Sequence, residues 1–234
     1  MIVWLASYPR SGNTFLRIVL HRLYDVPTYS VYEDDDPVAQ RVGPTIVGYR
    51  PKPADRKLMA DGPEVHFVKT HKRRKADGYP AIYLVRDGRD SVVSAAKLRA
   101  TTESAPGEGK SRFERLLREE ITRSYIAGQP SSGSWGGNVL SWLDGAAPLA
   151  VLRFEDLVAD PCGAAALAVS SLMPDLVPAA NVSIPSFNEL HGIDPDFFRR
   201  GVVGSHRDEM PDELRELFWA QSENAVAMRR LGYG

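Results

Sequence analysis

The chain has 234 residues, a formal net charge of -1 and 25% charged side chains, a balance that argues against a nucleic-acid coat protein or an acidic tail. Its one cysteine, Cys162, excludes an internal disulfide and fits a reducing compartment. We find no targeting segment, and no stretch approaches the ~20 apolar residues that a membrane span needs. We therefore expect a soluble, cytoplasmic protein that binds neither nucleic acid nor a membrane.

Short apolar runs alternate along the chain with segments of helical periodicity. The predicted strands are residues 2–6 (IVWLA), 65–70 (VHFVKT), 81–85 (AIYLV) and 148–156 (PLAVLRFED). The predicted helices are residues 14–24, 90–100 (with Asp90 as N-cap), 111–126, 138–145 and a last helix that has Pro211 near its start and Gly232 past its end. The alternation predicts one α/β domain over residues 1–234, with a mostly parallel sheet of about four to five strands flanked by helices.

Three segments lack such periodicity. Residues 25–64 contain six prolines and the acidic run EDDD, so we expect them to be irregular. Residues 101–110 and 129–137 have the composition of loops.

The turn after the first predicted strand has the spacing of a phosphate-binding P-loop. Residues 7–14 read SYPRSGNT, with Gly12 at the second glycine position and Thr14 at the final hydroxyl. Asn13 stands where a P-loop has its lysine. Main-chain N–H groups at a helix N-terminus still favour an anion, and Arg10 can supply the missing charge. The alternative is an ordinary strand-to-helix turn in which Ser11 caps the helix.

A second site of similar design follows the strand 81–85. Arg86 lies at the carboxyl end of that strand, where open α/β sheets bind ligands, and Ser94 follows in the next helix. An arginine fork and a hydroxyl suit a phosphate dianion. The alternative is a surface ion pair of Arg86 with Asp87 or Asp90. Two such sites in one sheet predict a ligand with two separated phosphate groups.

The segments that carry these sites resemble the sulfotransferases that use 3′-phosphoadenosine 5′-phosphosulfate (PAPS). Six segments occur in that family's order: SYPRSGNTF (7–15), VKTH (68–71), YLVRDGRDSVVS (83–94), GSWGGNVLSWL (133–143), RFEDL (153–157) and RRGVVGSHRD (199–208). The resemblance implies a P-loop-like α/β fold and transfer of a sulfuryl group from PAPS to an acceptor hydroxyl, without a metal. The product would be 3′,5′-adenosine bisphosphate (PAP).

The resemblance also assigns roles to residues. His71 would be the general base, and Lys69 and Arg10 would stabilise charge in the transition state. In a regular strand, Lys69 and His71 share one face while Thr70 points away. The donor-binding residues would be Arg10, Ser11, Gly12, Asn13, Thr14 and Phe15 for the 5′-phosphosulfate, Arg86 and Ser94 for the 3′-phosphate, Phe154 for adenine, and Arg199, Arg200 and Gly201 in a closing loop over residues 199–208.

The acceptor is not named by any motif. The chain is shorter than sulfotransferases of phenols and steroids, which favours an open cleft for a bulky natural product, saccharide or glycopeptide. The basic run 72–75 (KRRK) is typical of a solvated face, and the alternative is attraction of an anionic acceptor. Two other functions stay open: a phosphotransferase that uses Mg-ATP, with Thr14 on the metal, and a non-catalytic nucleotide-binding module. The oligomeric state also stays open, with a homodimer as one option.

Overall fold

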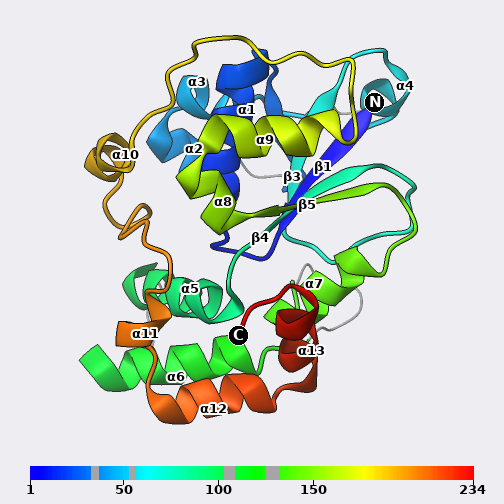
Figure 1. Cartoon of the computed structure of the whole chain (residues 1–234). Helices are drawn as coiled ribbons and strands as arrows, with labels where there is room; N and C mark the ends of the chain where they lie inside the picture. Colours follow the sequence, from blue (N-terminus) through cyan, green and yellow to red (C-terminus); the bar gives the residue numbers. More distant parts are fainter. Residues whose placement is uncertain (33–36, 53–55, 103–108, 125–131) are drawn as a thin grey trace.

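The strands of the computed structural model form one parallel sheet between two layers of helices (Figure 1). The structure describes residues 1–32, 37–52, 56–102, 109–124 and 132–234. In these residues the sheet has five strands in the order β2-β3-β1-β4-β5. The strands are β1 (Ile2–Ser7), β2 (Thr28–Ser30), β3 (His66–Thr70), β4 (Ala81–Val85) and β5 (Leu149–Arg153). The predicted α/β class and mostly parallel sheet are therefore confirmed.

Helices follow most of the strands and return the chain to the next one. Their bounds are α1 (Asn13–Tyr24), α2 (Pro37–Val42), α3 (Pro44–Val47), α4 (Arg56–Asp61), α5 (Gly88–Thr102), α6 (Gly109–Ile121), α7 (Trp135–Leu143), α8 (Phe154–Ala159), α9 (Pro161–Ser170), α10 (Phe187–Ile193), α11 (His206–Glu209), α12 (Asp212–Ala220) and α13 (Ser222–Arg230).

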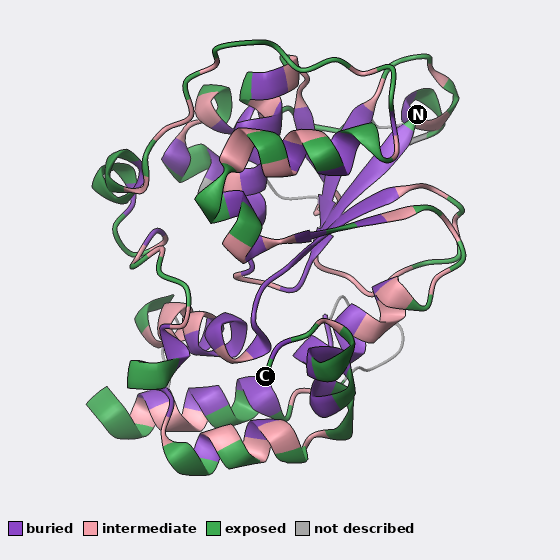
Figure 2. Cartoon of the chain, in the orientation of Figure 1, coloured by how far each residue is buried: buried purple, intermediate pink, exposed green. Residues whose placement is uncertain are grey.

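The central strand β1 is buried on both faces, as its unbroken apolar sequence predicts (Figure 2). Val3 and Leu5 face a core shared with α1, α8 and α9. Ile2 and Trp4 face the opposite core, shared with α5, α6, α7, α12 and α13. Because all strands are parallel, their carboxyl ends meet at one edge of the sheet. The chain between α9 and α11 crosses from one helical layer to the other along the left-hand side of Figure 1.

The expectation that residues 25–64 are irregular was wrong, because β2, α2, α3 and α4 all fall within them. The regular structure there depends on long-range contacts. Thr28 donates its main-chain N–H to Gly48, and its hydroxyl accepts a hydrogen bond of 3.0 Å from the buried Arg17 guanidinium. Strand β2 has three residues, too few to show a periodicity.

Asp90 is not the N-cap of α5. The helix begins at Gly88, and the Ser91 N–H donates to the Asp87 carbonyl, so Asp87 precedes the first turn. The Asp90 carboxylate instead accepts hydrogen bonds from the distant residues 204–206.

Several predicted bounds shift. Helix α7 begins at Trp135 rather than 138, so the predicted loop 129–137 ends early, and the Ser134 side chain caps the helix by accepting the Gly137 N–H. Strand β5 ends at Arg153, and α8 follows at once. The predicted last helix is two helices, α12 and α13, which meet at Gln221. Helix α6 ends at Ile121 rather than 126, and parts of the predicted segments 101–110, 111–126 and 129–137 lie outside the described residues.

Candidate active site

A cavity of about 470 Å³ lies at the carboxyl ends of the strands, within the size range of sites that bind cofactors and drug-sized ligands. Its walls come from the β1–α1 loop, the ends of β3 and β4, helix α5, the β5–α8 junction and residues 184–205. The predicted site residues that line it are Arg10, Gly12, Asn13, Thr14, Phe15, Lys69, His71, Arg86, Ser94, Phe154, Arg199, Arg200 and Gly201. Ser11 is buried behind the wall, with its hydroxyl 3.5 Å from that of Ser91.

The β1–α1 loop has the backbone of a tight anion-binding turn. Arg10 and Gly12 both have positive φ angles, 66° and 96°. A Cβ atom at Gly12 would lie 2.5 Å from the Phe154 ring, so both the dihedral angle and the space require glycine. Gly12 is also the N-cap of α1, which makes the alternative of a Ser11 cap wrong. Among the described residues no side chain caps this helix, and its first N–H groups can serve an anion.

Asn13 stands at the position of the P-loop lysine, but its side chain bonds to strand β1 instead of reaching into the cavity as a cation. Its amide nitrogen donates to the Leu5 carbonyl at 3.0 Å and to the Ser7 hydroxyl at 3.2 Å. The side chain therefore ties the start of α1 to strand β1. A ligand in the cavity would meet the main chain of Asn13 rather than a cationic side chain.

His71 is held in a defined orientation at the end of β3. Its Nδ1 lies 3.0 Å from the Ser7 main-chain oxygen and 3.2 Å from the Ser7 hydroxyl. A carbonyl oxygen only accepts, so Nδ1 carries the proton and the neutral ring has its lone pair on Nε2. The main chain is fixed as well, because the His71 N–H donates to the Tyr32 hydroxyl and its carbonyl accepts from Asn138, both at 3.0 Å.

Lys69 and His71 line the same cavity, whereas Thr70 faces a different pocket on the other side of the strand. The expected alternation along this segment is therefore confirmed. Lys69 is buried, and its ammonium nitrogen lies 5.9 Å from the centre of the Tyr32 ring. A base and a buried cation thus border the same space.

Three arginines converge at the end of the cavity next to α5. The Arg10 Nε donates to the Ser94 hydroxyl at 3.1 Å, and its guanidinium stacks 4.2 Å from the centre of the Phe197 ring. Burial, together with the nearby charges of Arg86 and Arg199, lowers the pKa of Arg10 to about 10. An anion bound here would relieve that repulsion, so the cluster has the electrostatics of a phosphate site.

Arg86 forms the floor of this cluster. Its guanidinium stacks on the Phe154 ring at 4.6 Å and donates to the carbonyl oxygens of Arg10 and Val202. It also lies 3.4 Å from the Asp90 carboxylate, but this pair is buried rather than at the surface. Arg86 therefore lines the cavity and also forms the ion pair with Asp90 that the alternative expected, although that pair is not at the surface.

Residues 199–208 close one side of the cavity. Arg199 forms a two-point ion pair with Glu209, at 2.6 and 2.7 Å, and Arg200 lies 3.7 Å from the same carboxylate. Gly201 has a φ angle of 60° and packs so closely on Phe187 that a Cβ atom would collide with the ring.

Asp90 anchors this segment to α5. Its carboxylate accepts hydrogen bonds from the main-chain N–H groups of Gly204 and His206 and from the His206 ring. Burial by itself would raise the pKa of Asp90, but the hydrogen bond from His206 and the charge of Arg86 hold that pKa well below its usual range.

Sequence reasoning missed two residues that position His71. Tyr32 lies in the segment expected to be irregular and gave no signal. Asn138 lies within the segment GSWGGNVLSWL, which resembles a segment of the family but does not indicate which of its residues reaches the site. Both act through contacts between residues far apart in the chain.

Comparison with known proteins identifies the family. The sequence model of the sulfotransferase domain matches residues 2–166, more than half of the chain. The chain belongs to the sulfotransferase family. The expected family of PAPS-dependent sulfotransferases and the expected enzyme class are thereby confirmed.

Solved structures share the fold at low sequence identity. Mouse sulfotransferase SULT7A1, complexed with PAP, is 19% identical with a TM-score of 0.66, and the match covers 100% of this chain and 89% of that one. A retinol dehydratase in complex with androsterone and the inactive cofactor PAP is 19% identical with a TM-score of 0.57, and the match covers 97% of this chain and 80% of that one. A retinol dehydratase in a complex with retinol and PAP is 18% identical with a TM-score of 0.55, and the match covers 97% of this chain and 81% of that one.

No helix in the described part of this sulfotransferase is both long and apolar enough to cross a lipid bilayer.

Proposed function

We propose that this sulfotransferase binds PAPS across the 470 Å³ cavity and transfers its sulfuryl group to a hydroxyl of a bulky natural product, saccharide or glycopeptide. The observation that carries the proposal is the contact between His71 Nδ1 and the Ser7 carbonyl, which leaves the lone pair of the neutral ring on Nε2. His71 lines the same cavity as Lys69 and the arginine cluster. Residues 1–234 act as one domain, with residues 199–208 as the loop over the donor.

Each residue then has a defined chemical task. His71 Nε2 accepts the proton of the acceptor hydroxyl as the new oxygen–sulfur bond forms. The bond between sulfur and the 5′-phosphate oxygen breaks, and PAP leaves with both electrons of that bond. Lys69 and the N–H groups at the start of α1 stabilise the charge that builds on the leaving phosphate. No step in this scheme uses a metal.

Phosphate recognition divides between the two ends of the cavity. The β1–α1 loop (Gly12 to Phe15) serves the 5′ end, and Arg86 with Ser94 serves the 3′-phosphate. Arg10 donates to Ser94, which favours a role for its guanidinium at the 3′-phosphate rather than at the transferring sulfuryl group. Phe154, stacked on Arg86, offers a ring face for adenine.

Calorimetric titration tests the donor assignment. We expect PAP to bind equally well with and without EDTA, and ATP with Mg²⁺ to bind much more weakly. Nothing in the site favours a phosphotransferase, because the side chain at the lysine position is Asn13, whose amide is bonded to β1. Tighter binding of Mg-ATP than of PAP would overturn the proposal. Sulfonation that survives unchanged in His71→Ala would overturn the role of His71.

A further inference from the structure

A second pocket lies directly across β3 from the proposed active site. It has a volume of about 130 Å³, equivalent to roughly four water molecules of liquid, so it suits a single small group rather than a nucleotide. Thr70 and Lys72 line this pocket, while Lys69 and His71 line the larger cavity. The same four-residue segment therefore presents alternate side chains to the two spaces.

The second pocket is strongly basic. Among the residues that the structure describes, four cationic side chains line it, from Lys52, Lys72, Arg73 and Lys75, together with one carboxylate, Asp77. That carboxylate already accepts hydrogen bonds from the Trp4 indole and the Tyr79 N–H. Neither Lys72 nor Lys75 pairs with an acidic side chain among the residues that the structure describes. The positive charge is local, since the chain as a whole has a net charge of -1.

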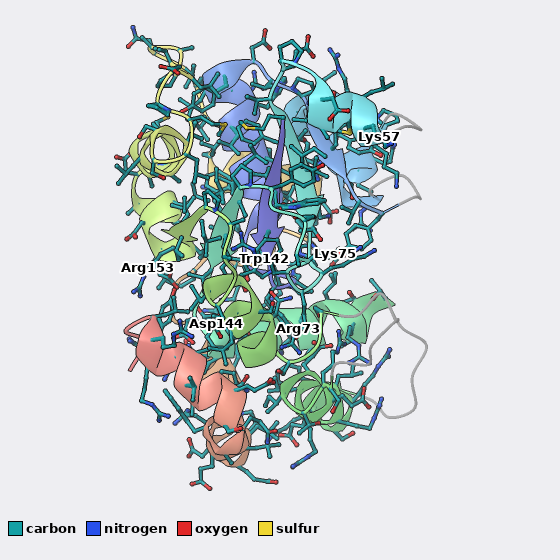
Figure 3. The ribbon with its side chains drawn as sticks, turned by 90° about the vertical axis from the view of Figure 1, so that its right-hand side faces the viewer. Lys57, Arg73, Lys75, Trp142, Asp144 and Arg153 are labelled. Atoms are coloured by element: carbon teal, nitrogen blue, oxygen red, sulfur yellow. The ribbon has the colours of Figure 1, made fainter. Side chains whose placement is uncertain are left out.

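The run 72–75 is not simply a solvated basic face. Arg74 turns away from the pocket and donates to the carbonyls of Trp142 and Ala147, at 3.1 and 2.8 Å. The main chain is also fastened to α7, because the Lys72 carbonyl accepts from the Trp142 indole and the Arg74 N–H donates to Ser141. Figure 3 shows this side of the molecule, with Lys75 close to Trp142 and Arg73 below them.

The floor of the pocket is apolar, formed by Trp4, Val68, Met59 and Trp142. An ordinary explanation is that the lysine stems cover this surface while their heads extend into water. A low-polarity floor, however, also strengthens the attraction between the cationic heads and any anion that enters. The two explanations differ in one measurable respect, which is whether an anion binds.

The Tyr32 ring joins this pocket to the proposed active site. Its centre lies 5.7 Å from the Lys72 ammonium, 5.9 Å from the Lys69 ammonium and 6.1 Å from the centre of the His71 ring. The His71 ring centre and the Lys72 ammonium nitrogen can therefore be no farther apart than the 6.1 Å and 5.7 Å distances laid end to end, because both are measured to the centre of the Tyr32 ring. An acceptor that reaches both positions past the Tyr32 ring therefore needs a span of no more than that length.

We propose that this pocket binds an anionic group of the acceptor, a carboxylate or a sulfate, while the reacting hydroxyl of the same molecule lies at His71. The inference rests on the proposed function and narrows its acceptor to an acidic saccharide or similarly acidic molecule. Lys72, Arg73 and Lys75 determine this preference, and Tyr32 lies between the anionic group and the reacting hydroxyl.

Inorganic sulfate is the first probe. The chain is saturated with PAP and then titrated with sodium sulfate by calorimetry, with sodium chloride added to keep the ionic strength constant. We expect one sulfate to bind, and Arg73→Gln combined with Lys75→Gln to weaken it about tenfold or more, since each removed cation faces the anion across a partly apolar space. The control replaces two exposed cations elsewhere, Lys110→Gln with Arg229→Gln, and should change the affinity less than twofold.

Binding of a matched pair of acceptors is the second probe. A glucuronate-containing disaccharide and its methyl ester share the same hydroxyls and differ in one charge. We expect the acid to bind the PAP complex more tightly than the ester, and the Arg73 and Lys75 double variant to remove most of that difference.

The outcomes separate this inference from the proposed function. Failure of PAP to bind would overturn the proposed function itself. Normal PAP binding without sulfate binding, or with sulfate affinity unchanged in the double variant, would overturn the basic pocket alone. Sulfate binding accompanied by equal or absent binding of the acid and the ester would overturn the acceptor assignment.

Discussion

The Nδ1 atom of His71 lies 3.0 Å from the main-chain oxygen of Ser7, so the end of β3 is bonded to the end of β1 through a histidine ring. The contact follows from the register of the sheet, in which Ala6 is paired with Thr70, so that the next residues, Ser7 and His71, lie beside each other. It sets the tautomer of His71 through a main-chain carbonyl. A neutral base next to a buried lysine is the arrangement that deprotonation of a hydroxyl needs.

Replacing His71 with alanine should therefore remove the base and leave donor binding nearly intact. We expect the rate at saturating donor and acceptor to fall by ~10²–10⁴, with the affinity for PAP within a factor of about three. Steady-state kinetics and calorimetry on the same preparation measure the two quantities. A loss of PAP affinity as large as the loss of rate would mean that His71 serves the donor rather than the acceptor.

Replacing Arg86 with alanine should have the opposite effect. It removes a charged contact to the proposed 3′-phosphate, which costs roughly 1.5–3 kcal/mol or about one to two decades of affinity. The rate at saturating donor should change less than the affinity. Arg229→Ala, at an exposed position on α13, is the control and should leave PAP binding unchanged. Wild-type PAP affinity in Arg86→Ala would exclude this residue from the donor site.

Asn138 offers a test of how far the position of His71 matters. Its side chain is fully buried, donates to the His71 carbonyl at 3.0 Å and accepts from the Tyr83 hydroxyl at 2.9 Å. We expect Asn138→Ala to lower kcat about 10- to 100-fold through misplacement of the base, with the KM for donor unchanged. It should also lower the free energy of unfolding by about 1–3 kcal/mol, because the Tyr83 hydroxyl and the carbonyls of His71 and Ser132 each lose a partner.

Tyr83→Phe is the matched control for that variant. It removes the hydroxyl that donates to Asn138 but keeps the contact between Asn138 and His71. We expect a similar kind of stability loss with kcat nearly unchanged. An equal fall in kcat in both variants would show that stability, rather than the position of His71, determines the effect.

Much of the site could be predicted because parallel strands end at one edge of a sheet. Arg86 was placed at the site because it follows a predicted strand, and Lys69 and Phe154, which lie near strand ends, were placed there by the family resemblance. What could not be predicted depends on contacts between distant residues. Tyr32 reaches His71 because the three-residue strand β2 pairs with β3, and no local pattern announces so short a strand. The chemical roles of these residues stay predictions until the variants are measured.

Asp90 shows why a local rule failed within the same site. A short acidic residue near the start of a predicted helix indicates an N-cap, but its partners Gly204 and His206 lie more than a hundred residues later in the sequence. The orientation of Arg10 toward Ser94 was likewise unpredictable, because it depends on Phe197 from the crossing segment. The motifs predicted that these residues lie at the cavity, whereas the orientation and hydrogen-bond partners of their side chains depend on tertiary contacts.

The Asp90 anchor predicts a dependence of stability on pH. The pKa of Asp90 is lowered in the folded chain, so its contribution is fully present above the pKa of an unfolded aspartate, about 3.9, and is lost as pH falls toward the folded value. We expect Asp90→Asn to reduce the free energy of unfolding by about 1–3 kcal/mol at pH 7, because residues 204–206 lose a charged acceptor.

The difference between wild type and Asp90→Asn should shrink as pH is lowered below about 4, because Asp90 then takes up a proton in the unfolded chain but stays ionised in the folded chain, which favours unfolding. Denaturant unfolding at several pH values measures it. Asp208→Asn, at an exposed position within residues 199–208, is the control and should show little difference at any pH. A stability gap for Asp90→Asn that stays constant from pH 7 to pH 3 would show that the carboxylate's charge does not hold residues 199–208 against α5.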